Sequence, residues 1–109
     1  MRRDEILRGT LDLLVLKTLA RGRELHGFEI AASISQTSHD VFSVEEGSLY
    51  PALQRLLVKG WVTAAWSTTA GNRRARYYRL TPAGRKHLQT EVAQFERVVG
   101  AITRVIHAT

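Results

Sequence analysis

The sequence of 109 residues contains no cysteine, only two prolines and no long uninterrupted apolar run. The absence of cysteine excludes disulfides and thiolate metal sites, and it fits the reducing cytoplasm in which we expect the protein to act. A transmembrane helix needs roughly 20 apolar residues, but Asp12 and Lys17 interrupt the longest candidate. The N-terminal residues also lack the apolar core of a secretory signal. We therefore expect a cytoplasmic protein that does not enter the membrane.

Acidic residues are missing from the middle of the chain. Residues 47–90 carry eight Lys or Arg and no Asp or Glu, whereas residues 1–46 carry six basic and eight acidic residues. The net charge of +6 therefore comes from the central segment. Such a segment indicates a polyanionic partner, because each neutralised phosphate releases counterions. A basic surface that is merely solvated is the alternative.

Recognisable catalytic patterns are also missing. No carboxylate pair, metal-ligand set, nucleophile motif or phosphate-binding loop is present. The histidines at positions 26, 39, 87 and 107 show no ligand spacing. We expect no enzyme, no cofactor and no metal site, and we expect His26 to cap or pack at the start of a helix.

Apolar periodicity predicts three short helices. The first spans about residues 5–20 and is apolar on two sides, so a second subunit is one way to cover it. The second spans about residues 26–37. Its predicted buried residues are Phe28, Ile30, Ala31 and Ile34.

The third helix has two possible starts. It begins near Gly47 or Ser48 if Pro51 lies in its first turn, where proline is tolerated. A capping box formed by Ser43 and Glu46 would start it earlier, and Pro51 would then kink it. Its core-facing residues are predicted to be Leu49, Leu53, Leu56 and Leu57, with Ser48, Tyr50, Ala52, Gln54 and Arg55 facing elsewhere.

Residues 61–66 and 75–80 are rich in β-formers and flank a polar loop that contains a Gly71-Asn72 turn signal. They predict a hairpin in which Tyr78 points inward and Tyr77 is more exposed. Gly60 is well placed to end the preceding helix. Thr81 and Pro82 predict the start of a last helix that reaches about Ile106.

The order of three helices and a hairpin predicts a mostly α fold, a winged helix-turn-helix over residues 1–80, followed by a long C-terminal dimerisation helix over residues 81–109. Apolar residues of the last helix recur every 3.5 residues, the spacing of a coiled-coil seam. The alternative is that this seam packs on its own chain. The predicted dimerisation residues are Leu11, Leu88, Val92, Phe95, Val99, Ile102 and Ile106.

Three stretches resemble signatures of the PadR family of transcriptional regulators. They are HGFEI at residues 26–30, GSLYPALQRL at residues 47–56 and RYYRLTPAGR at residues 76–85. The resemblance covers roughly residues 9–90. It implies a homodimeric winged-helix repressor of the short-tailed subgroup, often responsive to a small ligand, in which the first and last helices pack against their counterparts.

The predicted DNA-binding residues lie on the third helix and at the hairpin tip. The resemblance implies that Tyr50 reaches a backbone phosphate. Ser48 bonds a phosphate or base edge, or only caps the helix; Gln54 reads adenine if it faces the groove; and Arg55 reaches phosphate or stays solvated. Arginines at the tip are positioned for the minor groove or its flanking phosphates: Arg73, Arg74 and Arg76.

The leading function is a repressor that binds a pseudo-palindromic operator in double-stranded DNA as a homodimer. The alternative is a winged-helix module that binds another protein and no DNA. An apolar or aromatic effector is possible between the subunits, although the last helix has no tryptophan. The residues expected around that cleft are Leu13, Leu16, Val92, Phe95 and Val99.

Overall fold

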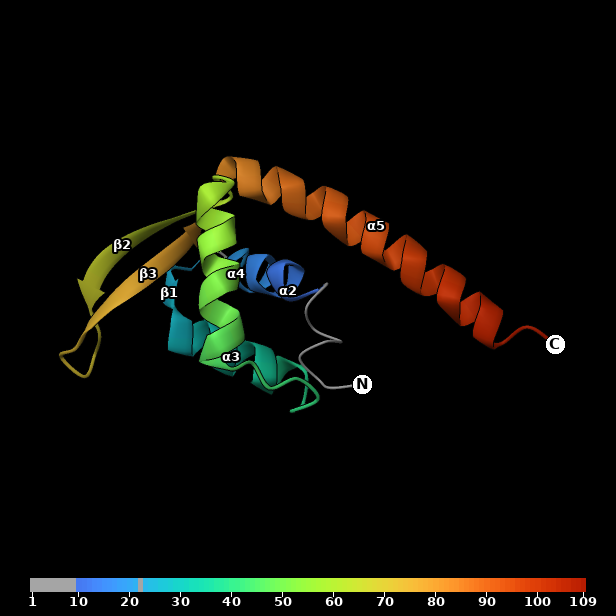
Figure 1. The fold of residues 1–109 in the computed structure, drawn as a ribbon, viewed down its shortest axis with the longest axis horizontal. Coiled ribbons are helices and arrows are strands. Elements are labelled where there is room, and N and C mark those ends of the chain that lie inside the picture. Colours follow the sequence, from blue (N-terminus) through green and yellow to red (C-terminus); the bar gives the residue numbers. More distant parts are fainter. Residues whose placement is uncertain (1–9, 22) are drawn as a thin grey trace.

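The computed structural model describes residues 10–21 and 23–109. Its helices are α2 (Leu11–Leu19), α3 (Gly27–Thr37), α4 (Glu46–Val58) and α5 (Pro82–Ile106), and its strands are β1 (Leu25–His26), β2 (Val62–Thr68) and β3 (Arg74–Leu80). The part of the predicted first helix before Thr10 lies outside the described residues. The fold is mostly helical, with a winged-helix arrangement of helices and hairpin (Figure 1).

The sheet has three antiparallel strands in the order β1-β3-β2, one more than the predicted hairpin. The added strand β1 is only two residues long, and Leu25 pairs with Tyr78 while His26 pairs with Tyr77. A strand this short has no periodicity for a sequence to reveal. Tyr78 is buried and Tyr77 is more exposed, as the alternation along the strand predicts.

Local capping signals place the ends of three helices. The side chain of His26 accepts a hydrogen bond from the backbone N–H of Glu29, while the Glu29 carboxylate accepts one from the backbone N–H of His26. This reciprocal pair starts α3. At the end of α4, Gly60 has a φ of +74°, and the N–H of Trp61 bonds to the carbonyl of Leu56. This is the Schellman arrangement that glycine favours.

Thr81 connects the end of α4 to the start of α5. Its hydroxyl donates to the carbonyl of Gly60 over 2.8 Å and accepts from the N–H of Gly84 over 2.9 Å. Pro82 occupies the first turn, where its missing N–H has no helical partner to lose. The predicted restart at Thr81-Pro82 and the predicted end at Ile106 are therefore confirmed.

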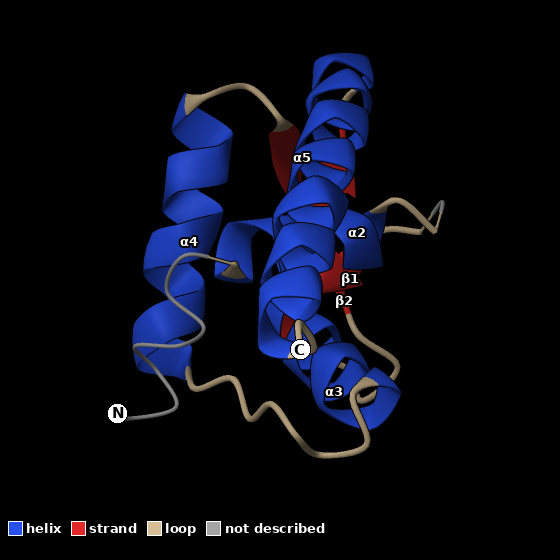
Figure 2. Cartoon of the chain, turned by 90° about the vertical axis from the view of Figure 1, so that its right-hand side faces the viewer, coloured by secondary structure: helices blue, strands red, loops and turns tan. Residues whose placement is uncertain are grey.

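The core lies where α2, α3 and α4 meet the inner face of the sheet and the first turns of α5. Beyond that point α5 extends away from the other helices, on the side opposite the hairpin (Figure 1). Figure 2 shows the same helix running across the front of the molecule, with the strands behind it. The buried apolar residues are Leu11, Val15, Leu16, Leu19, Ile30, Ile34, Leu49, Ala52, Leu53, Leu56, Val62, Tyr78, Leu80 and Leu88.

Two core predictions are wrong. Phe28, expected in the buried face of α3, is 79% exposed. It lies two residues before the buried Ile30, and residues two apart do not share a face of a helix. Ala52, expected to face away from the core, is fully buried. It belongs to the same stripe as Leu49 and Leu56, three residues before it and four after.

Candidate nucleic-acid interface

The start of α4 differs from both predicted versions. The helix begins at Glu46 after Glu45, and no side-chain hydrogen bond caps it, so the Ser43–Glu46 capping box does not form. Pro51 is the sixth residue of the helix and lies inside it. Because proline has no N–H, the bond that residue 51 would give to the carbonyl of Gly47 is missing. The start of α4 is therefore stabilised by no side-chain cap, and the helix lacks one backbone hydrogen bond at Pro51.

The two faces of α4 separate core residues from exposed polar ones. Leu49, on the inner side, is buried, whereas Tyr50 is 51% exposed. Gln54 and Arg55 are exposed, and Ser48 is half-buried. This side of α4 therefore leaves a phenol and an amide accessible to a partner.

The hairpin of β2 and β3 is the wing: its turn includes Arg73, and Arg74 and Arg76 follow on β3. The N–H of Thr69 donates to the carbonyl of Arg73 over 2.7 Å, and the N–H of Arg73 donates back to the Thr69 hydroxyl over 3.2 Å. Asn72 has a φ of +62°, a conformation that asparagine tolerates better than most residues. These contacts hold the tip in a defined shape although its side chains are exposed.

Two of the wing arginines lie over aromatic rings. The guanidinium of Arg74 is 5.1 Å from the ring centre of Trp66, and that of Arg76 is 5.9 Å from the ring centre of Tyr78. Contacts of this kind orient a cation without neutralising it. Burial raises the pKa of the Tyr78 phenol, and the nearby positive charge of Arg76 opposes this rise. Tyr78 is therefore an uncharged support for the wing at neutral pH.

Among the described residues, Arg79 and Arg55 are the arginines that form an ion pair with an acidic side chain. Arg79 forms an ion pair with Glu24. Arg55 forms one with Asp12, whose hydrogen bond is the main cause that raises the pKa of Arg55. The two arginines hold parts of the chain together, and much of their charge is matched internally.

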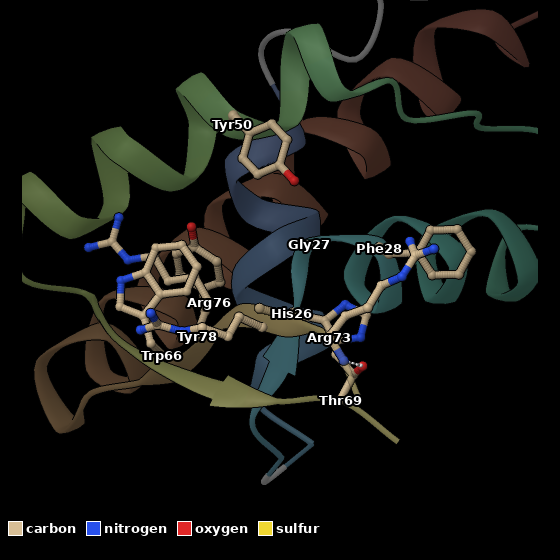
Figure 3. Close-up of a pocket in the computed structure, with 11 residues that line it drawn as sticks. His26, Gly27, Phe28, Tyr50, Trp66, Thr69, Arg73, Arg76 and Tyr78 are labelled. Carbon is tan, nitrogen blue, oxygen red and sulfur yellow. Dashed lines mark hydrogen bonds between the residues drawn. The ribbon is translucent and has the colours of Figure 1, made fainter. Parts of the chain in front are cut away.

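The exposed side chains meet at a cleft of about 740 Å³ between the start of α3, Tyr50 of α4 and the hairpin. Figure 3 shows Tyr50 on one side of this cleft, with the hairpin residues opposite and Phe28 at its edge. No Asp or Glu is among the described residues that line it. The lining residues are His26, Gly27, Phe28, Tyr50, Trp66, Thr69, Arg73, Arg74, Ala75, Arg76 and Tyr78.

The cleft brings together four of the seven residues predicted to bind DNA. These are Tyr50, Arg73, Arg74 and Arg76. The other three, Ser48, Gln54 and Arg55, are absent from its lining. Sequence reasoning missed Phe28, Trp66 and His26 as lining residues, because it predicted that Phe28 is buried and that His26 caps or packs at the start of a helix, and it gave Trp66 no binding role.

The apolar seam of α5 divides into a buried and an exposed part. Leu88 is 5% exposed and packs in the core of its own chain, as does Leu11 at 3%. Since neither offers surface to a second subunit, they are removed from the predicted dimerisation residues. The exposed apolar residues of α5 are Phe95, Val98, Val99, Ile102, Val105 and Ile106, with Val92 partly buried.

Burial within the single chain also reduces the set of residues predicted to line the effector cleft. Leu16 is only 1% exposed and lies in the core, so it lines no cleft open to a second subunit. Leu13 and Val92 are partly buried at the edge of the core.

Among the described residues no group of three His, Asp or Glu side chains is arranged to hold a metal ion. No helix of residues 10–21 and 23–109 has the length and apolarity needed to cross a bilayer.

Comparison with known proteins identifies similar sequences and folds. The sequence model of the Transcriptional regulator PadR-like family matches residues 15–90. The Uncharacterized protein X of Lysinibacillus sphaericus is 31% identical over 98 residues, which cover 90% of this chain and 89% of that protein.

Two solved structures have the same arrangement of elements. A transcriptional regulator from Clostridium thermocellum is 27% identical with a TM-score of 0.82, over 92% of this chain and 96% of that chain. A PadR family transcriptional regulator from Eggerthella lenta is 26% identical with a TM-score of 0.80, over 96% of this chain and 88% of that chain. In both cases the similarity extends over nearly the whole chain.

Proposed function

This chain belongs to the PadR-like family of transcriptional regulators, and on that premise we propose that it is a homodimeric repressor of a pseudo-palindromic operator, released by a small effector. Members of this family are regulators that bind DNA rather than enzymes. The observation that carries the proposal is the cleft that Tyr50 shares with Arg73, Arg74 and Arg76, with no Asp or Glu among its described lining residues. In this proposal, residues 1–80 contact DNA and residues 81–109 join two subunits.

The cleft fits duplex DNA because its two sides offer different contacts. Tyr50 belongs to α4, the helix that would enter the major groove. The wing arginines would then reach the flanking phosphates or minor groove, where positive side chains are favoured. Arg73 and Arg74 are exposed and form no ion pair among the described residues, so their full charge is available to phosphates.

The exposed seam of α5 supports the homodimer. Phe95, Val99 and Ile102 are large apolar residues at helical spacing that no part of the described chain covers. A second copy would bury them and would set two α4 helices about 34 Å apart, one turn of the double helix. The effector would occupy the apolar space between the subunits, around Leu13, Val92, Phe95 and Val99.

The DNA part of the proposal is tested with a duplex that the protein selects from a random library. Fluorescence anisotropy at several salt concentrations should give a log affinity that falls linearly with log salt, because phosphate contacts release counterions. Replacing Arg73, Arg74 and Arg76 together with alanine should abolish binding. Selection of no duplex, or binding that ignores salt, would overturn the DNA-binding function and favour a protein-binding module.

Repression and release need separate measurements. A reporter promoter that carries the selected duplex should be less active when the protein is expressed, and an increase would indicate an activator instead. Small apolar compounds that release the duplex from the wild-type protein, but not from a Phe95→Ala variant that still binds DNA, would support the effector site. Equal release from both would place the effector elsewhere.

A further inference from the structure

Two glycines of the chain are required by the fold itself. Gly60 has a positive φ that other residues rarely adopt. A Cβ at Gly84 would lie 2.0 Å from the carbonyl oxygen of Trp61. In each case the described structure itself explains why a side chain is unfavourable.

Gly47 is different. It is the second residue of α4 and has no positive φ, and a Cβ built there would meet no described atom within 4 Å, including the ring of Pro51 one turn later. Alanine would therefore fit without strain. Glycine inside a helix is less favourable than alanine by about 0.5–1 kcal/mol. The fold of the described chain thus gains nothing visible from glycine at this position.

The position of Gly47 indicates what could require it. It is exposed and lies three residues before Tyr50, so the two residues neighbour one another on the helix surface. Tyr50 lines the basic cleft, and Gly47, which is not itself among the lining residues of this cleft or of the neighbouring hollow between α3 and α4, lies one turn before it. The bare backbone at Gly47 therefore belongs to the surface that α4 presents to a partner.

We propose that Gly47 is a close-approach position, where the wall of a DNA groove packs directly on the backbone of α4. A side chain here would hold the duplex away from Tyr50 and from the wing arginines at the same time. The inference rests on the proposed DNA-binding function and adds to it a residue that controls how deeply α4 enters the groove. Close approach to a ligand is one of the few roles in which the missing Cβ of glycine is itself the functional feature.

The test compares Gly47→Ala and Gly47→Leu with the wild-type protein. Thermal unfolding should show melting temperatures equal to or above that of the wild type, because alanine and leucine favour a helix and have open space. Affinity for the duplex that the wild type selects should nevertheless fall, by about tenfold or more for alanine and further for leucine. The opposite signs of the two effects separate loss of contact with DNA from loss of folding.

Gly100→Ala is the matched control. Gly100 also lies inside a helix, α5, and only the end of the flexible Arg104 side chain comes within 4 Å of a Cβ built there. This change should alter helix stability in the same direction as Gly47→Ala, and it should leave both the assembly measured by sedimentation and the affinity for the duplex, within about twofold, as in the wild type. A comparable loss of affinity in Gly100→Ala would overturn the specific role of Gly47.

The remaining outcomes are also decisive. If both Gly47 variants bind the duplex as the wild type does, the close approach is wrong while the DNA-binding function stands. If Gly47→Ala unfolds at a lower temperature, the chain itself needs this glycine and the inference is also wrong. If the wild type selects no duplex, the proposed function fails first and the inference fails with it.

Discussion

The guanidinium of Arg55 donates two hydrogen bonds to the carboxylate of Asp12, with Nη2–Oδ1 and Nε–Oδ2 distances of 2.8 and 3.3 Å. The pair joins α4 to α2 across 43 positions of sequence. Both side chains are partly exposed, so the pair adds less than about 1 kcal/mol to stability. Its main consequence is that the positive charge of Arg55 is already matched, unlike the charge of Arg74.

Arg55→Ala is therefore predicted to weaken DNA binding less than Arg74→Ala. Loss of Arg74 should lower affinity for the selected duplex and reduce the slope of log affinity against log salt by about one, the change expected for one lost phosphate contact. Loss of Arg55 should leave that slope nearly unchanged. Anisotropy titrations at several salt concentrations measure both, and Arg79→Ala serves as a second arginine with an acidic partner. Equal slopes for Arg55→Ala and Arg74→Ala would show that the ion pair opens on DNA.

Elements set by neighbouring residues were predictable from the sequence. The cap at Thr81, the Gly60 end of α4 and the alternation of Tyr77 and Tyr78 each depend on residues within one or two turns of one another. The outcome was different where distant parts of the chain meet. Strand β1 exists because Leu25 and His26 pair with β3, more than 50 positions away.

The candidate site shows the same limit. The basic tip of the wing was evident from composition, because charge without acidic neighbours is visible in a linear sequence. The sequence did not reveal that Arg55 is ion-paired while Arg74 is not, because Asp12 becomes a partner of Arg55 only when α2 packs beside α4. In α5, a single apolar repeat contains both Leu88, which is buried in its own chain, and Phe95, which is exposed. Periodicity identifies the face of a helix but not what covers it.

Gly84→Ala is predicted to destabilise the protein strongly. The new Cβ would lie 2.0 Å from the carbonyl oxygen of Trp61, a backbone atom that cannot rotate away. Since that oxygen also accepts the N–H of Thr81, separation of α5 from the end of α4 would break the hydrogen bond as well. Overpacking of this kind costs about 2–3 kcal/mol, which urea unfolding can measure. Ala83→Gly, at the exposed neighbouring position, controls for a change of residue in the same turn, and an equal cost for both would contradict the steric explanation.

We predict that the contribution of Tyr78 to the free energy of unfolding decreases at alkaline pH. Burial raises the pKa of its phenol in the folded chain above the value of about 10 for an unfolded tyrosine. The contribution of the neutral phenol is therefore complete below about pH 10, and it is lost as the pH rises through the folded pKa. The free energy of unfolding of the wild type, minus that of Tyr78→Phe, should fall when urea unfolding is repeated above that pH. A difference that stays constant would mean that the pKa of Tyr78 is the same in the folded and the unfolded chain, so that burial does not raise it.

The exposed seam of α5 gives a prediction about assembly. Val99→Glu places a charge among the apolar side chains that a second subunit would cover, and burial of an unpaired charge is strongly unfavourable. Sedimentation should therefore show a monomer whose circular dichroism is unchanged, since Val99 is exposed in the single chain. Affinity for a duplex with two half-sites should fall by at least about 100-fold, because the second half-site is no longer bound as part of the same complex. Gln94→Glu adds the same charge five residues earlier, on another side of the helix, and should remain dimeric. A dimer that survives Val99→Glu with full affinity would mean that the subunits meet through a different face.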